Sequence, residues 1–465
     1  MGPALITDPS VLLGYLRDAS NTEGHADGLL RPNNAQEVAA ILRDCQAAGR
    51  PVTVTAQRTS TTGGPVPEGG WLLSTERLSR IHTLGPDLAV AEGGVLLGEL
   101  QLEIEATGRF YPPDPTSKDE CSLGGSIACN ASGARTFRYG PTRPWVEAVK
   151  VVLPTGELLT ATRDTPIPTS WPRLDWREPK VKTAAGLYPA ENLLDLIIGS
   201  EGILGVITEA TVRLTALPKR VFSILIPFPS AEAGLSFVMR HRRVGPLSPR
   251  LMEWFDSHSL DMVRARVPDL PADAQAALWC EQEATDEDAD ALMEAWLEAL
   301  EESGAMMHAV IFAEDPSSLE RLRLFRHALP AAVNERVAHN GMPKVGTDFA
   351  VPDSALPEMM AAYAEVTLPH VLFGHIGDNH LHLNLFPRSP DELTAARAVW
   401  ATLFRKAISL GGTVSAEHGV GKLKRRFLAE MVGPEVLSSF VALKRHVDPA
   451  WILGRGTMLE IPESS

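Results

Sequence analysis

The chain has 465 residues, enough for two to four domains at roughly 100–200 residues each. Its 58 acidic residues outnumber the 43 lysines and arginines, and the net charge of −15 argues against binding of nucleic acid or a polybasic contact with anionic lipid. The cysteines include no Cys-x-x-Cys pair, no apolar run approaches the ~20 residues of a membrane span, and the start lacks a basic signal region. We therefore expect a cytoplasmic protein with at most peripheral contact with the inner membrane.

The first readable unit is a helix followed by a short strand. Asn34 and Glu37 form a capping box, apolar residues at helical spacing follow over 38–45, and Gly49 is a natural end. Residues 51–54 read as a strand. The chain therefore opens with an α/β layer.

The later elements follow from the same signals of periodicity, proline and glycine. In the first half we expect strands at 89–95, 146–153 and 203–214, a helix at 96–108, a turn at 154–157 and a proline-rich surface loop at 163–180. From Val221, apolar strands alternate with acidic helices, such as 286–303, whose apolar residues share one face. We place the main domain boundary near residue 220 and a glycine-rich last segment from 411 onwards.

Three glycine-rich loops interrupt the first half, at 59–64, 122–133 and 199–205. The sequence contains neither a Gly-x-Gly-x-x-Gly fingerprint after a strand nor a P-loop, which disfavours a Rossmann site. Successive backbone N–H groups in such loops can surround a pyrophosphate, whereas each loop alone reads equally well as a tight turn. Together they favour a large phosphate-containing cofactor.

Histidines and a carboxylate gather in two late segments. A strand from His380 would place His380, His382 and Asn384 on one face, and the Gly-Asp-Asn turn would fold His375 back beside them. Glu417 and its neighbour His418 are expected on opposite sides of a short extended segment. Two imidazoles and a carboxylate suit zinc, manganese or iron, while buried structural histidines are the alternative.

The motifs fall in the order of a known family. They are Pro32…Glu37-Val38, Thr59–Gly64, Asp114-Pro115, Gly124–Asn130, Arg138-Tyr139-Gly140 and Gly199–Gly205. The chain resembles the FAD-linked oxidases of the vanillyl-alcohol oxidase superfamily, in the branch of D-lactate, glycolate and D-2-hydroxyglutarate dehydrogenases. The resemblance implies an α+β fold with a two-subdomain, non-Rossmann FAD-binding region, an α/β cap domain and a C-terminal helical segment. We assign these to residues 1–220, 221–410 and 411–465.

The resemblance also implies a set of FAD-binding residues. They are Arg58, Thr59, Ser60, Gly63, Gly64, Pro115, Gly124, Gly125, Ser126, Asn130, Gly133, Tyr139, Gly140, Glu201, Gly202, Leu204 and Val206. No His or Cys occupies the flavin-attachment positions of covalent relatives, so we expect noncovalent FAD. The chain departs from the family at 56–58, where Arg58 could add a cation to the pyrophosphate, and at 454–457 in the last loop.

The resemblance implies roles for the remaining site residues as well. His375, His382 and Glu417 match the metal ligands, and His418 matches the catalytic base. Arg326 matches an arginine that binds the substrate carboxylate, for which a surface ion pair is the alternative. His380 stands where the family has an asparagine. Lys344 lies two places from a substrate lysine of some relatives, and the basic residues of 422–426 read as a solvated helix face.

The resemblance implies oxidation of a D-2-hydroxy acid, with D-lactate as first choice and glycolate or D-2-hydroxyglutarate behind it. The electron acceptor would be external: a quinone, an electron-transfer flavoprotein, a cytochrome, a separate subunit or dioxygen. Three alternatives stay open. They are an alkylglycerone-phosphate-synthase-like flavoprotein, which should lack the histidine–glutamate set, a flavin-free metal hydrolase built on His375, His382 and Glu417, and a noncatalytic subunit of a larger complex.

Overall fold

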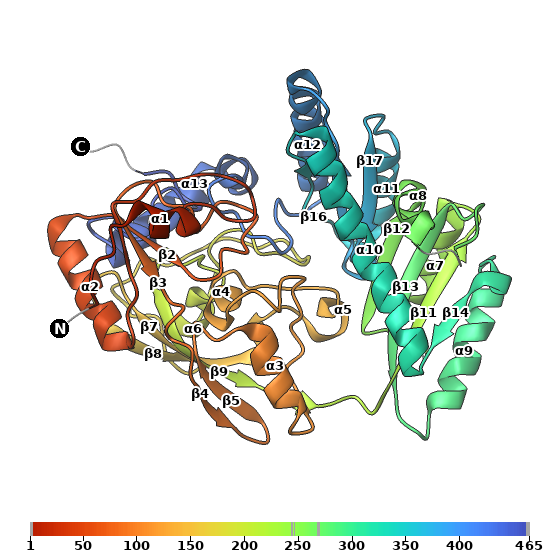
Figure 1. Cartoon of the computed structure of the whole chain (residues 1–465), viewed down its shortest axis with the longest axis horizontal. Helices are drawn as coiled ribbons and strands as arrows, with labels where there is room; N and C mark the ends of the chain where they lie inside the picture. The colour runs from red at the N-terminus through yellow and green to blue at the C-terminus, as the bar shows by residue number, and fades with distance from the viewer. Residues whose placement is uncertain (1–2, 243–244, 246, 267–269, 462–465) are drawn as a thin grey trace.

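The computed structural model describes residues 3–242, 245, 247–266 and 270–461, without the side chains of residues 316, 323, 326 and 327. Two groups of sheets lie side by side and are joined by the extended segment that leads into β11 (Arg220–Phe228), as Figure 1 shows. The C-terminal segment returns to the first group, so both ends of the chain lie on the same side of the molecule. The boundaries at 220 and 410 remain predictions.

The first sheet confirms the opening unit. It is a parallel sheet in the order β1-β3-β2, with β1 at Gly28–Leu30, β2 at Val52–Thr55 and β3 at Trp71–Ser74. Helix α2 (Ala35–Ala48) begins after Asn34, whose side chain accepts from the backbone N–H of Glu37, and ends at Gly49 in the left-handed conformation. The buried face of α2 packs against this sheet.

The second sheet is antiparallel, in the order β4-β5-β9-β7-β8. Its strands are β4 (Ile81–Leu84), β5 (Leu88–Glu92), β7 (Val146–Val152), β8 (Leu158–Thr162) and β9 (Val206–Arg213). Helices α3 (Leu97–Glu105), α4 (Leu123–Ala128) and α6 (Leu193–Ile197) accompany it. The predicted strands and helix are confirmed, except that β9 begins at Val206 because the glycine loop continues to Gly205. Short elements complete this part: α1 (Pro9–Leu12), α5 (Thr136–Tyr139), and the pair β6 (Arg109–Phe110) and β10 (Thr215–Ala216).

The third sheet is large and antiparallel, in the order β14-β11-β13-β12-β17-β18-β15, with β16 also paired to β18. Besides β11, its strands are β12 (Leu251–Asp256), β13 (Ala276–Ala284), β14 (Ile311–Ala313), β15 (Val345–Gly346), β16 (Phe349–Ala350), β17 (His370–Gly374) and β18 (His380–Leu385). The predicted strand at His380 is therefore confirmed.

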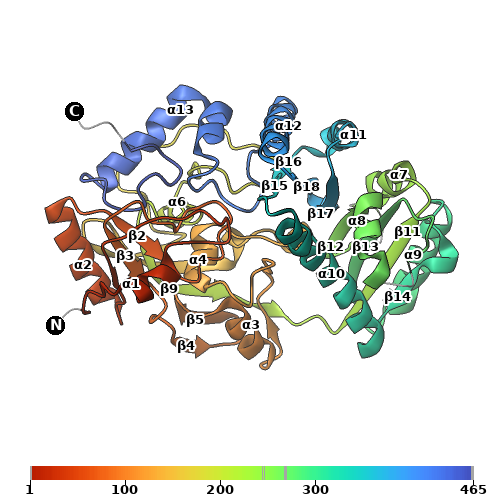
Figure 2. The ribbon, with the colours of Figure 1, turned by 45° about the horizontal axis from the view of Figure 1, so that its top comes forward.

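Helices cover both faces of this third sheet because its strands alternate between two cores (Figure 2). Ile224 packs with α7 (Ala231–His241) and α9 (Ala289–Glu301), whereas Leu225 packs with α8 (Ser257–Val263) and α10 (Pro316–Asn340). Helix α9 is the predicted acidic helix, with Trp296 on its buried face. A further helix, α11 (Leu356–Ala364), precedes β17.

The last two helices lead the chain back to the first group of sheets. Helix α12 (Pro390–Ser409) follows the third sheet, and α13 (Arg425–Val447) is broken at Gly433, whose φ is +79°. Lys444 of α13 donates to the backbone carbonyl of Ile203, and Leu453 bridges Val52 of β2. The C-terminal end of the chain therefore packs against the first half. No helix of the described ranges is long and apolar enough to cross a membrane.

Candidate active site

A cavity of about 1460 Å³ runs between the glycine loops and the third sheet. It is larger than the ~300–1,000 Å³ of most small-molecule sites, so it has room for a dinucleotide and a substrate together. Eleven of the predicted cofactor residues line it: Arg58, Thr59, Ser60, Gly64, Pro115, Gly124, Gly125, Ser126, Glu201, Gly202 and Val206. His382, Glu417 and His418 line the other end.

Close backbone contacts shape the cofactor end of the cavity. A Cβ on Gly124 would lie 2.8 Å from the carbonyl oxygen of Gly93, so only glycine lets α4 approach β5 this closely. A Cβ on Gly421 would lie 2.2 Å from the carbonyl oxygen of Thr62. This second contact holds the loop at 59–64 against the C-terminal segment, and the backbone N–H of Lys422 donates to the same carbonyl.

Six predicted cofactor residues are not among the described residues that line the cavity: Gly63, Asn130, Gly133, Tyr139, Gly140 and Leu204. Their partners lie inside the protein. The Asn130 side chain accepts from the N–H of Arg143, the Tyr139 hydroxyl donates to Glu283 of β13, and Leu204 is fully buried. Their part in FAD binding stays a prediction.

Glu201 lines the cavity but directs its carboxylate toward the C-terminal segment. Its two oxygens accept from the backbone N–H groups of Val420 and Gly421, each at 2.7 Å. Burial raises the pKa of this carboxyl, while the two backbone donors oppose the rise. Glu201 therefore joins the third glycine loop to the segment that carries Glu417.

Arg58 lines the cavity in the left-handed conformation, with φ of +59°. Its guanidinium lies over the ring of Tyr15, 4.5 Å from the centroid, and donates to the carbonyl of Ala56. These contacts hold the cation at the cavity wall, beside the loop predicted to bind pyrophosphate.

The predicted metal ligands converge at the other end. Nε2 of His375 lies 3.3 Å from Oε2 of Glu417, and Nε2 of His382 lies 3.2 Å from Oε1. His375 follows β17, His382 is on β18, and Glu417 belongs to the C-terminal segment. The turn at 376–379 folds His375 back as expected, because Asn379 adopts the left-handed conformation.

The outer nitrogens of both imidazoles have acceptors. Nδ1 of His375 lies 2.5 Å from Oε1 of Glu253, and Nδ1 of His382 lies 3.2 Å from the carbonyl oxygen of Thr347. Each ring therefore has its Nδ1 beside an acceptor and its Nε2 directed toward Glu417, which is the orientation of histidines that bind metals. Burial alone would lower the pKa of His375, but the Glu253 and Glu417 carboxylates raise it to about 9.

Glu417 is ionised in this setting. Burial would raise its pKa, but the Lys182 ammonium and the facing imidazoles hold the pKa well below its usual value. Two imidazole lone pairs and a carboxylate directed at one point suit a divalent cation such as zinc, manganese or iron. The residues present thus fit a metal.

His418 lies beside the cluster, and its predicted direction was wrong. The segment at 416–418 is bent rather than extended, so the Glu417 and His418 side chains converge instead of diverging. The His418 ring stacks on His382 at 5.3 Å and its side chain is 34% exposed toward the cavity. Burial in the cavity wall lowers the pKa of His418 to about 4, so the ring is neutral and able to accept a proton.

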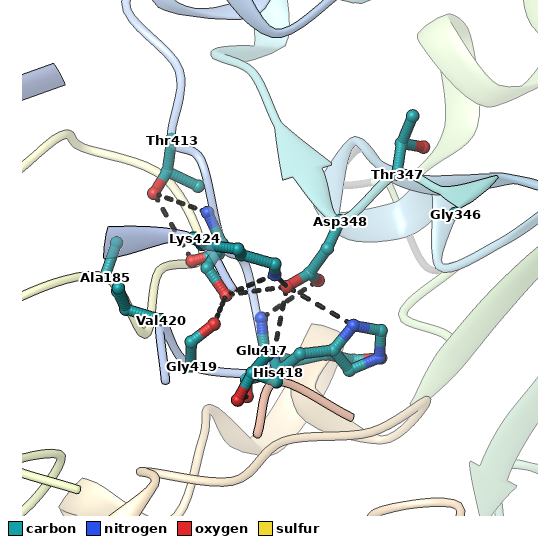
Figure 3. Close-up of polar contacts among 12 residues, drawn as sticks. Ala185, Gly346, Thr347, Asp348, Thr413, Glu417, His418, Gly419, Val420 and Lys424 are labelled. Carbon is teal, nitrogen blue, oxygen red and sulfur yellow. Dashed lines mark hydrogen bonds and ion pairs between the residues drawn. The ribbon is translucent and has the colours of Figure 1, made fainter. Parts of the chain in front are cut away.

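Asp348 organises this segment and was missed by the sequence analysis (Figure 3). Its carboxylate accepts from the backbone N–H groups of Glu417 and His418 and from the Ser415 hydroxyl and the Lys424 ammonium. Burial would raise the pKa of Asp348, but the Lys424 ammonium holds it well below its usual value. Asp348 begins an Asp-x-x-x-Pro segment that matches the family, but its role could not be predicted there, because its partners lie about 70 positions away.

Three lysines were also missed or misread. Lys182 follows the proline-rich loop and its ammonium lies 2.8 Å from Oε2 of Glu417, with a side chain 3% exposed. The residues 422–426 do not form a simple solvated helix face, since Lys422 donates to carbonyls of the 63–66 loop and Lys424 to Asp348. Lys344 lines the cavity. Arg326 belongs to α10, but its side chain lies outside the described residues.

Comparisons with known proteins identify the class. Residues 26–162 match the family described as FAD binding domain, and residues 217–458 match the family described as FAD linked oxidases, C-terminal domain. The chain therefore belongs to the FAD-linked oxidase family, and it is a flavoprotein oxidoreductase. This assignment confirms the resemblance and the predicted fold class, and it rules out the flavin-free hydrolase.

Relatives are similar over nearly their whole length. The chain is 29% identical to the glycolate oxidase subunit GlcD of Bacillus subtilis, over 96% of this chain and 92% of that protein. It is 31% identical to D-lactate dehydrogenase of Anaerostipes hadrus, over 92% and 88%. It is 30% identical to D-2-hydroxyglutarate dehydrogenase of Xanthomonas citri pv. viticola, over 98% and 94%. A solved alkyldihydroxyacetonephosphate synthase shares the fold, with a TM-score of 0.70, 15% identity and 97% of this chain covered.

Proposed function

We propose that this flavoprotein oxidises a D-2-hydroxy acid, D-lactate first, to the 2-oxo acid. The observation that carries the proposal is the convergence of His375, His382, Glu417 and His418 at the end of a cavity whose far wall is made of glycine loops. Relatives at about 30% identity are named for D-lactate and D-2-hydroxyglutarate, which supports this substrate class. Glycolate is a second candidate, supported by the name of the Bacillus relative.

Two bound groups supply the chemistry that side chains lack. Noncovalent FAD, held by the loops at 58–64, 124–126 and 201–206, supplies a hydride acceptor. A divalent metal held by His375, His382 and Glu417 supplies polarisation of the substrate hydroxyl and carboxylate. A cation fits this site because Nε2 of His375 and Nε2 of His382 both face the Glu417 carboxylate.

Side chains of the protein itself accept the proton and hold the reacting groups in position. His418 accepts the hydroxyl proton, because its ring is neutral and faces the cavity next to Glu417. Asp348 fixes the backbone of Glu417 and His418, so that the base and the ligand keep one mutual position. Phe373 and Trp400 add aromatic surface to the wall of the cavity. Arg326 remains a proposed partner of the substrate carboxylate.

The electrons must then leave the chain. We propose an external acceptor, which is a quinone, an electron-transfer flavoprotein, a cytochrome or a separate subunit. The described residues contain no Cys-rich cluster that could hold iron and sulfur, and the cysteines are free. The cytoplasmic location, with at most peripheral membrane contact, stays a prediction.

Steady-state assays with an artificial dye acceptor test this proposal. We expect FAD-loaded protein to reduce the dye with D-lactate, glycolate or D-2-hydroxyglutarate and not with L-lactate. His418→Gln should lose at least ~10²-fold in kcat, the lower end of the effect of a general base. His82→Gln, on exposed strand β4, is the matched control and should keep the activity. Equal turnover in His418→Gln, or no turnover with any of these acids, would overturn the proposal.

A further inference from the structure

His380 is the one histidine of the cluster that has no assigned role. It begins β18, two residues before His382, and its ring is fully buried. Neither of its ring nitrogens has a hydrogen-bond partner among the described residues, although the ring lies deep in a charged cluster. An unpaired polar atom in such a place is costly and requires an explanation.

The contacts of His380 repeat the pattern of the two proposed ligands. Its Nε2 lies 2.9 Å from Oδ1 of Asp348, which places a carboxylate beside the outer side of the ring. Its Nδ1 is on the side of Glu417, whose Oε2 lies 3.8 Å away. An outer nitrogen held by a carboxylate and an inner nitrogen left bare is the usual state of a metal-binding histidine.

Three imidazole nitrogens and a carboxylate gathered in one place are the donor set of a metal site, in which a divalent cation displaces the protons of the donors. The ligand atoms of His375, His380, His382 and Glu417 all lie within 4.8 Å of one another. Ligands at ~2.1 Å from a tetrahedral ion are ~3.4 Å apart, which is close to the 3.2, 3.3 and 3.8 Å that separate the three nitrogens from Glu417. The cluster is therefore of the right size for a four-ligand site.

Lys182 does not account for the arrangement. Its ammonium donates to Oε2 of Glu417 at 2.8 Å and so neutralises the carboxylate. Both ring nitrogens of His380 still lack a hydrogen-bond partner among the described residues, because the ammonium reaches only the carboxylate. A cation between the rings satisfies them all.

We propose that His380 is a fourth protein ligand of the metal, through Nδ1, and that Asp348 orients its ring. The inference rests on the proposed metal site and goes beyond it, because a metal with four protein ligands has fewer positions left for the substrate than one with three. The site then binds metal more tightly than a His₂Glu set would.

Titration of the FAD-loaded full chain with Co²⁺, after removal of metal with a chelator, tests this inference. Four-coordinate Co²⁺ absorbs visible light far more strongly than five- or six-coordinate Co²⁺, so the spectrum reports the ligands independently of activity. We expect wild type to bind one Co²⁺ with an intense spectrum. His380→Asn should lose that intensity and more affinity than the ~10–100-fold typical of residues that only orient a ligand.

Two further variants separate the alternatives. His380→Gln retains an N–H that can reach Asp348, and we expect it to behave as His380→Asn; recovery of wild-type binding would show that His380 acts only through Asp348 and would overturn the inference. His82→Gln, outside the cluster, should bind Co²⁺ as wild type does. Unchanged Co²⁺ binding in His380→Asn would refute the fourth ligand but leave the proposed metal site. Absence of Co²⁺ binding in wild type would refute the metal site itself.

Discussion

Asp348→Asn should weaken the whole catalytic end of the cavity. In the native protein Oδ2 of Asp348 accepts from the Ser415 hydroxyl and the Lys424 ammonium, both at 2.6 Å, and from the N–H of His418 at 3.1 Å. Oδ1 accepts from the N–H of Glu417 at 3.2 Å. An asparagine keeps only one acceptor oxygen, and its NH₂ group would face donors on the other side.

The size of the expected loss in the free energy of unfolding follows from the burial and the charges of Asp348 and Lys424. Asp348 is 1% exposed and Lys424 is 11% exposed, so the variant leaves a largely buried ammonium without its anion. Removing one partner of a buried pair costs about 3–5 kcal/mol, or roughly 10²–10⁴ in the unfolding equilibrium constant. The surface pair of Asp87 and Arg109, with Asp87 78% exposed, is the matched comparison. Asp87→Asn should cost about 0–1 kcal/mol.

The assay is urea unfolding followed by the fluorescence of released FAD, which reports on the part of the chain around the cavity. We expect the free energy of unfolding of Asp348→Asn to fall by about 3–5 kcal/mol, with a parallel loss of metal affinity. A loss no larger than that of Asp87→Asn would refute the view that Asp348 holds this segment.

Three other predictions concern the framework of the site. Lys444→Met should lower the free energy of unfolding in urea by about 3–5 kcal/mol, because Asp448 stays buried without its cation. Lys150→Met, which removes one partner of a surface pair, should lower it by less than about 1 kcal/mol, and equal losses would contradict this prediction. Gly124→Ala should cost about 1–3 kcal/mol and weaken FAD binding, because its Cβ would meet the Gly93 carbonyl, and Gly14→Ala, which meets nothing, should do neither. Burial raises the pKa of Cys45 and Cys121 to about 11 and of Cys129 to about 12. A thiol reagent at pH 8 should therefore react slowly with the native protein and rapidly after unfolding, and a fast reaction of these thiols in the native protein would contradict their burial.

Local signals were enough to predict several of the elements. Helix α2 was found from Asn34 and Gly49, because caps depend on neighbours within one turn. Strand β18 was found from the alternation at His380, since one strand face lies against the core. The turn that brings His375 back was also readable from its Gly-Asp-Asn sequence.

Contacts between distant segments could not be read in the same way. Asp348 and Lys182 meet Glu417 across 69 and 235 positions, and no spacing rule covers such pairs. The directions of Glu417 and His418 were wrong because bonds to Asp348 bend a segment whose sequence reads as extended. Tyr139 was assigned to the flavin by resemblance, which stays a prediction, and no local signal could show that its hydroxyl donates to Glu283, 144 positions away.

The central claim is that one cavity brings a flavin, a metal and His418 to the same hydroxy acid. The absorbance spectrum of the FAD-loaded chain, recorded anaerobically before and after D-lactate with L-lactate as control, tests it most directly. We predict bleaching of the flavin bands by D-lactate and none by L-lactate, and no bleaching in His418→Gln on the same time scale. A flavin spectrum that neither D-lactate, glycolate nor D-2-hydroxyglutarate changes would contradict the account.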